Sequence, residues 1–405
     1  MSLFSEFTLR PSSQKALEAM DIVTPTEIQA LSIPPLLEGK DVIGQAFTGS
    51  GKTLAFGLPL IERIDLKNKW LQALVLVPTR ELAQQVGAVL ESLARPAGIR
   101  STLIFGGRAF GPQQDAIYRG AQVVVGTPGR VLDHLTRGTM RLDGITCLVL
   151  DEADEMLDRG FAPDVERILS QTPGERQTSL FSATTPEWVH KVSQKYLRNP
   201  VVIETSRAEH ETGPDIDHVV YEVWDEDKFT VLLRLHDEST EGTTLVFGRT
   251  KHGVQNLGVK LQRLGYDIDV LQGNLSQGAR DRVLEKFRAG KTPILLATNV
   301  AARGLDVLHI TRVINFELPE THELFTHRVG RTGRMGRSGH AITILGPGDL
   351  PKWREIERGL GRTLPRMTPD GKEIKVAPPR STPSRNGSGG GFGSRRRRTT
   401  AFSRR

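Results

Sequence analysis

The chain has 405 residues, 38% hydrophobic and 25% charged, which is typical of a globular protein with room for two or three domains. No run of about 18 apolar residues occurs, which excludes a membrane-spanning helix of the usual length. The first residues, MSLFSEFTLRPSS, lack the layout of a signal peptide, so we expect a cytoplasmic protein. The single Cys147 excludes an internal disulfide, and its apolar flanks indicate a buried strand residue.

The net charge of +7 is concentrated in the last part of the chain. Residues 377–405 contain eight arginines and no lysine or acidic residue, whereas the rest carries 46 Lys and Arg against 47 Asp and Glu. This segment is rich in Pro, Ser, Gly and Arg and has almost no apolar residues, so we expect a disordered basic tail. Its charge favours nucleic acid as a partner.

Residues 1–205 alternate short Val, Ile and Leu runs with segments of helical period, such as Arg80–Leu93 and Pro186–Leu197. The predicted strands are Asp41–Gln45, Ala73–Val77, Thr102–Phe105, Gln122–Gly126, Thr146–Leu150 and Thr178–Phe181. This alternation predicts a parallel sheet covered by helices on both faces. Ligands of such sheets bind beyond the carboxyl ends of the strands, and several polar motifs of this sequence fall there.

Residues 206–216 contain Gly-Pro and indicate a linker, after which the alternation restarts over residues 217–376. Predicted strands here are His218–Val223, Thr244–Phe247, Asp267–Val270, Ile294–Ala297, Arg312–Phe316 and Ala341–Leu345. Predicted helices are Lys228–His236, Lys251–Leu264, Ser276–Ala289 and Trp353–Gly359. This second α/β domain has no G-x-x-x-x-G-K-[ST] pattern, so we expect no second nucleotide cradle in it.

The stretch Ala46 to Thr53, AFTGSGKT, lies between the first predicted strand and a helix start. Gly49 and Gly51 allow the backbone to turn its N–H groups toward a phosphate, while Lys52 can reach the β- and γ-phosphates and Thr53 can hold Mg²⁺. The first position of the pattern is Ala46 instead of glycine. The alternative is a Gly/Ser loop followed by a chance Lys-Thr pair.

The apolar strand ending at Leu150 is followed by Asp151-Glu152-Ala153-Asp154. Phosphate chemistry with Mg²⁺ requires carboxylates near the cradle. Asp151 would hold the ion, and Glu152 would orient or deprotonate the attacking water. The alternative is an acidic surface turn, but an acidic pair at the end of a buried strand favours catalysis in a chain with a phosphate loop.

Asp151-Glu152-Ala153-Asp154 resembles the signature of the DEAD-box RNA helicases, and AFTGSGKT resembles motif I of that family. The resemblance extends from Phe4 to about residue 365. It implies two tandem RecA-like α/β domains, each with a mostly parallel sheet flanked by helices, an ATP and Mg²⁺ requirement, and RNA as partner. The implied nucleotide ligands are Thr48, Gly49, Ser50, Gly51, Lys52 and Thr53, with Thr53 and Asp151 holding Mg²⁺ partly through water.

Upstream, Thr24 to Gln29 (TPTEIQ) resembles the family's Q motif, and Phe4 has the family's spacing before it. A glutamine amide matches the donor and acceptor of adenine, and an aromatic ring stacks on the base. The resemblance implies that Phe4, Thr24 and Gln29 bind the nucleotide, and that Phe4 and Gln29 select ATP over GTP. The alternatives are a helix-surface amide for Gln29 and a core anchor for Phe4. Asp21 stands where the family usually has glycine.

Three further stretches of the first domain resemble motifs Ia, GG and Ib, the RNA-backbone contacts of the family. They comprise Pro78, Thr79, Arg80, Gly106, Gly107, Thr127, Pro128, Gly129 and Arg130. Hydroxyls, exposed N–H groups and arginines are suitable phosphate ligands that read no sequence. The alternative is that Pro-Thr and Thr-Pro-Gly only begin helices.

Ser182-Ala183-Thr184 resembles motif III, which in the family couples ATP hydrolysis to strand separation. We expect its hydroxyls to bond Asp154. The alternative is that they cap the helix that follows Pro186.

In the second domain, residues 327–334 (HRVGRTGR) resemble motif VI. The resemblance assigns arginine fingers to Arg331 and Arg334 and coupling roles to His327 and Arg328. Such fingers stabilise transition-state charge and contribute about 10³ to 10⁵ in rate in other enzymes. A basic surface patch is the alternative.

Residues 297–306 (ATNVAARGLD) resemble motif V, which implies Thr298 at the RNA backbone, Arg303 at the domain interface and Asp306 at the ribose. Residues 245–250 (LVFGRT) resemble motif IV, with RNA contacts from Arg249 and Thr250.

Two residues of the second domain depart from the resemblance by losing a negative charge. Asn299 stands where the family usually has Asp. Asn274 falls in Gln272-Gly273-Asn274, followed by Gln277 and Arg280, where the family commonly has His-Gly-Asp followed by Gln and Arg. We hypothesise altered coupling between the domains, or weaker autoinhibition, which RNA-stimulated ATPase rates of Asn274→Asp and Asn299→Asp would test.

The sequence therefore predicts an ATP-dependent RNA helicase that opens short duplexes or remodels RNA–protein complexes. The tail resembles the auxiliary tails of bacterial members and is expected to tether RNA; the alternative is a solubilising tail. A DNA helicase, and an RNA clamp in which ATP is only a switch, are the rival functions. We expect a monomer, with ribosomal or RNA-decay assemblies as candidate partners.

Overall fold

The computed structural model describes residues 3–46, 49–205, 216–238, 242–299, 309–333 and 338–374. The segment Lys375–Arg405, which holds the predicted tail, lies outside the described residues. Within the described part, no helix is both long and apolar enough to span a bilayer.

The first sheet is entirely parallel, with the order β3-β4-β2-β5-β6-β1-β7. Its strands are β1 (Val42–Gln45), β2 (Ala73–Leu76), β3 (Ser101–Ile104), β4 (Val123–Gly126), β5 (Cys147–Asp151), β6 (Gln177–Ser182) and β7 (Val201–Glu204). The six predicted strands and the buried Cys147 are confirmed. Sequence analysis missed the edge strand β7, whose apolar run of three residues ends at Glu204.

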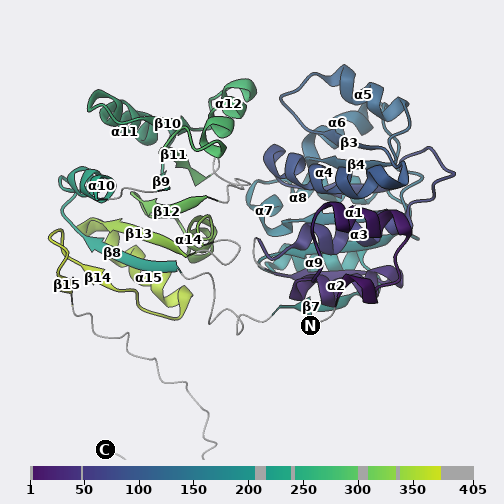
Figure 1. Cartoon of the computed structure of the whole chain (residues 1–405), viewed down its shortest axis with the longest axis horizontal. Helices are drawn as coiled ribbons and strands as arrows, with labels where there is room; N and C mark the ends of the chain where they lie inside the picture. The colour runs from purple at the N-terminus through teal and green to yellow at the C-terminus, as the bar shows by residue number, and fades with distance from the viewer. Residues whose placement is uncertain are drawn as a thin grey trace, which may run out of the picture. The chain divides into compact units, whose positions relative to one another are not determined.

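Helices cover both faces of this sheet (Figure 1). One face packs against α1 (Pro11–Ala19), α2 (Glu27–Leu37), α3 (Lys52–Arg63) and α4 (Arg80–Ala94), and the other against α6 (Pro128–Thr136), α7 (Ala153–Asp158), α8 (Ala162–Leu169) and α9 (Glu187–Tyr196). Helix α4 illustrates why these helices pack on the sheet. Its buried residues recur at helical spacing and form one apolar stripe: Leu82, Val86, Leu90 and Leu93. Helix α5 (Phe110–Tyr118) follows β3.

The second sheet has the order β10-β11-β9-β12-β13-β8-β14-β15 and is parallel except for the β14/β15 pair. Its strands are β8 (Ile216–Glu222), β9 (Thr243–Gly248), β10 (Ile268–Leu271), β11 (Ile294–Thr298), β12 (Ile310–Asn315), β13 (Gly339–Leu345), β14 (Arg366–Met367) and β15 (Glu373–Ile374). Its first six positions repeat the order of the first sheet, so that β8 corresponds to β1, β9 to β2 and β10 to β3. Each sheet is thus one RecA-like unit.

Helices also lie on both faces of the second sheet. Helices α10 (Lys228–Asp237) and α11 (Lys251–Arg263) pack on one face, and α12 (Gln277–Arg288), α14 (His322–Val329) and α15 (Leu350–Leu360) pack on the other. All four predicted helices of this domain are present; α14 and the short β14 and β15 were not predicted.

Asp21, where the resembled family usually has glycine, adopts φ of 55° after α1. This is the left-handed region, which glycine enters freely and which Asp tolerates better than most side chains. The glycine conformation of this turn is therefore kept without glycine.

Candidate functional site

The strand order of the first sheet sorts the predicted site residues into two groups. The phosphate loop, Asp151 and Ser182 follow or end β1, β5 and β6, which are neighbours in the order β5-β6-β1. The stretches resembling motifs Ia, GG and Ib follow β2, β3 and β4, which are neighbours in the order β3-β4-β2. Because the carboxyl ends of parallel strands share one edge, the residues predicted for phosphate chemistry lie on one half of that edge and the predicted nucleic-acid contacts lie on the other half.

The phosphate loop has the backbone that its glycines were expected to allow. Gly49 and Gly51 have φ of 95° and 93°, in the left-handed region, and α3 begins at Lys52. The buried Lys52 donates from Nζ to the Ala46 carbonyl at 2.7 Å. Ala46 itself is 4% exposed and fits the core, so this position of the pattern accepts a methyl group. Thr48 lies outside the described residues.

The Q-motif helix α2 is bonded directly to the phosphate loop. Gln29 Nε2 donates to the Gly51 carbonyl at 3.0 Å, and Thr26 Oγ1 donates to the Ser50 carbonyl at 2.8 Å. Gln29 Oε1 also accepts from the Thr26 N–H at 3.0 Å. Gln29 is buried, which rules out a helix-surface amide, and among the described residues its amide keeps one N–H and one lone pair for another partner.

The other two predicted nucleotide ligands of this region differ in exposure. Thr24 is exposed, whereas Phe4 is 4% exposed and packs edge-on against Phe7 with ring centroids 5.8 Å apart. Phe4 is thus a core residue in this structure, as the alternative interpretation holds. Its stacking on adenine stays a prediction.

The acidic centre follows β5. Asp151 is its last residue, and Glu152 has φ of 52°, a strained conformation of the kind that persists at functional sites. Burial raises the pKa of Asp151 to about 6 against the attraction of Lys52. Burial, then the charges of Glu155 and Asp151, raise the pKa of Glu152 well above its ordinary value. Among the described residues no group donates a hydrogen bond to Glu152 Oε2.

Motif III bonds the last residue of the acidic stretch, as expected. Asp154 Oδ2 accepts from both the N–H and the hydroxyl of Thr184, each at 2.9 Å, and the Asp154 N–H donates to Ser182 Oγ at 3.2 Å. Helix α9 begins at Glu187, and its N-cap Pro186 has no side-chain cap, so these hydroxyls are not used to start that helix.

We expect Thr184→Val to uncouple ATP turnover from unwinding. The variant keeps side-chain volume and the backbone bond to Asp154 but loses a hydroxyl bond to a carboxylate, a bond worth roughly 1.5–3 kcal/mol. Duplex unwinding per ATP hydrolysed should fall by about tenfold or more. Thr172→Val is the matched control, because that hydroxyl bonds only the Leu169 carbonyl. An equal fall in ATPase and unwinding would contradict the expectation.

The predicted nucleic-acid contacts of the first domain lie around Arg80. Thr79 caps α4 by accepting from the Leu82 N–H at 3.0 Å. A Cβ at Gly107, which has φ of 82°, would collide with the Arg80 guanidinium, so glycine is what allows that side chain to lie across the loop. Thr127 precedes α6, whose first residues are Pro128, Gly129 and Arg130.

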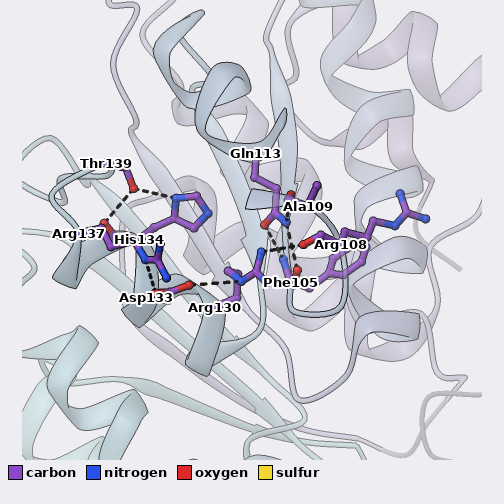
Figure 2. A network of polar contacts seen from close by, with 9 residues as sticks. All are labelled: Phe105, Arg108, Ala109, Gln113, Arg130, Asp133, His134, Arg137 and Thr139. Carbon is purple, nitrogen blue, oxygen red and sulfur yellow. Dashed lines mark hydrogen bonds and ion pairs between the residues drawn. The ribbon is translucent and has the colours of Figure 1, made fainter. Parts of the chain in front are cut away.

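Sequence analysis missed the side chains that hold the GG loop and motif Ib in place (Figure 2). Gln113 accepts from the Phe105 N–H at 3.1 Å and donates to the Phe105 and Ala109 carbonyls. Arg130 donates to the Arg108 carbonyl at 3.1 Å, which joins the two motifs. Glutamine is common in helices, so nothing in its local sequence marked Gln113 for this role.

A second set of missed residues packs α5 against α6. The Phe110 ring stacks on His134 with centroids 4.0 Å apart, and the Arg137 guanidinium lies 4.5 Å from the Phe110 centroid. Asp133 pairs with Arg137 at 2.7 Å (Figure 2). Burial, with the nearby Arg130, lowers the pKa of His134, so the imidazole is neutral at pH 7 and stacks without adding charge.

In the second domain, Arg249 and Thr250 follow β9, and Thr298 ends β11. His327 and Arg328 lie in α14, and the Nε of the buried Arg331 donates to the His327 carbonyl at 3.1 Å. Arg303, Asp306 and Arg334 lie outside the described residues. Gln277 and Arg280 also contact motif Ia: Arg80 donates to Gln277 Oε1 at 2.6 Å, and Arg280 pairs with Glu81.

Both asparagines that depart from the family pattern accept a hydrogen bond from a cation. Arg328 Nε donates to Asn299 Oδ1 at 2.5 Å, and Lys251 Nζ donates to Asn274 Oδ1 at 3.0 Å. Burial lowers the pKa of Arg328 to about 9, although Glu317 opposes this. The guanidinium is still charged at pH 7, and Asn299 bonds it without neutralising it.

The fold and this sheet edge define a P-loop nucleoside triphosphatase of two RecA-like domains, with an acidic pair beside the phosphate loop and a separate group of predicted nucleic-acid contacts. Comparison with known families gives the narrower identity. The "DEAD/DEAH box helicase" family model matches residues 26–192, and the "Helicase conserved C-terminal domain" model matches residues 227–336. The chain belongs to the DEAD/DEAH box helicase family.

Among its relatives, the DEAD-box ATP-dependent RNA helicase CshA of Geobacillus kaustophilus is 44% identical over 91% of this chain and 79% of its own length. The ATP-dependent RNA helicase CshA of Listeria monocytogenes is 44% identical over 91% of this chain and 70% of its own length. Solved structures include S. cerevisiae Dbp5 bound to RNA and ADP BeF3, with a TM-score of 0.83, 34% identity and coverage of 91% of this chain and 96% of that one. A DEAD box protein of Methanococcus jannaschii has a TM-score of 0.53 and 38% identity, with coverage of 90% of this chain and 99% of that one.

Proposed function

We propose that this chain is an ATP-dependent RNA helicase that opens short RNA duplexes or remodels RNA–protein complexes. The observation that carries this is the division of one sheet edge into a phosphate half with Lys52, Asp151 and Glu152 and a nucleic-acid half around Arg80. The relatives named as ATP-dependent RNA helicases, and the RNA-bound Dbp5 with its nucleotide analogue, support both ligands.

Mg²⁺ fits the acidic centre. Two buried carboxylates lie next to each other there, burial raises both of their pKa values, and Glu152 Oε2 lacks a donor within the described part of the chain. Thr53 and Asp151 would hold the ion, which would neutralise phosphate charge when bound. Glu152 would take the proton of the attacking water, and Lys52 would move from the Ala46 carbonyl to the phosphates.

The remaining roles extend the proposal to the second domain. Arg331 and Arg334 would stabilise the transition state, Thr298, Arg249 and Thr250 would bind the RNA backbone, and Arg303 and Asp306 would join the domains and bind the ribose. The protein would act as a cytoplasmic monomer on RNA, with ribosomal or RNA-decay assemblies as candidate settings.

The test is the ATPase rate with single-stranded RNA, with DNA of matched sequence and with neither. RNA should stimulate turnover strongly and DNA should not, because RNA selectivity rests on 2′-hydroxyl contacts. Equal stimulation by DNA would favour a DNA helicase. RNA binding that depends on ATP but gives no stimulated turnover would favour a clamp.

We expect truncation after Val376 to weaken RNA binding chiefly at low salt. If all eight tail arginines met phosphates, their loss would reduce the salt slope of single-strand affinity by roughly 5 to 6. Filter binding of full-length and truncated proteins over a salt series measures this. An unchanged slope would assign the tail to solubility.

A further inference from the structure

Lys251 is the first residue of α11, and its position in the second domain repeats that of Arg80 in the first. The two sheets share a strand order in which β9 corresponds to β2. Both cations follow a threonine that caps the next helix: Thr79 and Thr250 each accept from the backbone N–H three residues on, at 3.0 and 2.9 Å. Lys251 is thus the topological counterpart of a predicted RNA contact.

Each cation also lies against a glycine: Arg80 against Gly107 in the loop after β3, and Lys251 against Gly273 in the loop after the corresponding strand β10. A Cβ on Gly107 would collide with Arg80, and a Cβ on Gly273 would lie 3.3 Å from Lys251 Cε and 3.7 Å from its Nζ. Strand β11 lies between β9 and β10 and ends at Thr298. The Lys251 side chain therefore bridges the loops on either side of the strand that carries another predicted RNA contact.

The ammonium of Lys251 is held by a neutral group. Its Nζ donates to Asn274 Oδ1 at 3.0 Å, and the Asn274 N–H donates to Gln272 Oε1 at 2.7 Å, which fixes the loop. In the described part of the chain, no carboxylate lies within 4.0 Å of this Nζ. The Glu317 carboxylate lies at the start of α11 but accepts from the Arg249 N–H at 2.6 Å.

We propose that Lys251 is a further RNA-phosphate contact, and that Asn274 holds its ammonium in place while leaving its charge available. The inference rests on the proposed RNA helicase function. An aspartate at position 274 would form an ion pair with the ammonium and compete with the phosphate for it. Because the ligand is a phosphate oxygen, the contact adds affinity for RNA of any sequence and makes that affinity depend on salt.

The test measures RNA affinity of the full-length protein over a salt series, with poly(U) and poly(A) oligonucleotides and a non-hydrolysable ATP analogue. Lys251→Ala should reduce the salt slope by about 0.7 on both sequences. Asn274→Asp should reduce it equally, because the pair would hold the ammonium. Asn274→Ala should retain the wild-type slope, and the Lys251→Ala, Asn274→Asp double variant should have the slope of Lys251→Ala alone. The far-UV circular dichroism spectrum and the thermal unfolding midpoint check that each variant is folded.

Two controls make the same charge changes elsewhere in this domain. Lys291→Ala removes an exposed cation before β11, at the opposite sheet edge, and Asn256→Asp adds an anion on the exposed side of α11; neither should change the slope. An unchanged slope in Lys251→Ala, or equal effects of Asn274→Asp and Asn256→Asp, would overturn the inference. If wild-type RNA binding itself showed no salt dependence, the proposed function would fall with it.

Discussion

Glu152→Gln should reduce RNA-stimulated ATP turnover by about 10² to 10⁴, the range for loss of a general base. The amide retains the size of the side chain but cannot accept the proton of water. In the wild-type protein, burial raises the pKa of Glu152, which makes it a stronger base than an exposed carboxylate. RNA affinity in the presence of ATP should be kept or increased, because the bound state no longer turns over. Steady-state ATPase and RNA-binding assays measure the two properties.

Glu155→Gln tests the cause of this raised pKa, because after burial the negative charge of Glu155 is the main factor that raises the pKa of Glu152. Turnover in this variant should persist, with the acidic limb of the rate–pH profile moved to lower pH. Full activity of Glu152→Gln would remove Glu152 from catalysis, and an unmoved profile in Glu155→Gln would remove the assigned cause of its pKa.

Asp151→Asn should abolish Mg²⁺-dependent turnover and yet stabilise the ligand-free protein at pH 8. Burial raises the pKa of Asp151 from 3.8 to about 6, so the folded state binds more protons than the unfolded state between these values. Stability therefore falls as pH rises through that window, by roughly 2–3 kcal/mol in all. Asparagine avoids this cost. The unfolding midpoint of the first domain should rise by about 5 °C at pH 8.

The pH dependence distinguishes this effect from a general change in stability. The gain should be roughly half as large at pH 5, where part of the wild-type carboxyl population is already protonated. Asp115→Asn, an exposed carboxylate on α5, should change the midpoint little at either pH. A gain that does not vary with pH, or a lower midpoint at pH 8, would be inconsistent with a destabilising buried charge. Calorimetry without nucleotide or Mg²⁺ makes the measurement.

The sheet strands and most of the phosphate site were predictable because each rests on a local pattern. Apolar runs marked the central strands, and the spacing in AFTGSGKT marked the loop whose glycines adopt positive φ. Strand β7 escaped detection because its apolar run is short: Val201, Val202 and Ile203 are followed at once by Glu204.

What the sequence did not reveal are contacts between residues far apart in the chain. Gln29 was assigned to adenine from its motif, but its bond to the Gly51 carbonyl depends on how α2 packs on the loop. Gln113 fixes the loop of the predicted RNA contacts after β3, and His134 packs α5 against α6, through tertiary contacts that no spacing encodes. The significance of Asn274 likewise emerged only when Lys251 was found bonded to it.

The division of the first sheet edge into two halves predicts two classes of variant with different kinetic effects. Substitutions in the loops after β3, β4 and β2 should change the RNA concentration needed for half-maximal turnover and leave the maximal rate unchanged. Substitutions in the loops after β5, β6 and β1 should lower the maximal rate and leave that RNA concentration unchanged. Strands β2 and β5 are the neighbours that join the two halves, so second-site substitutions that restore activity to both kinds of variant should cluster along the β2/β5 pair.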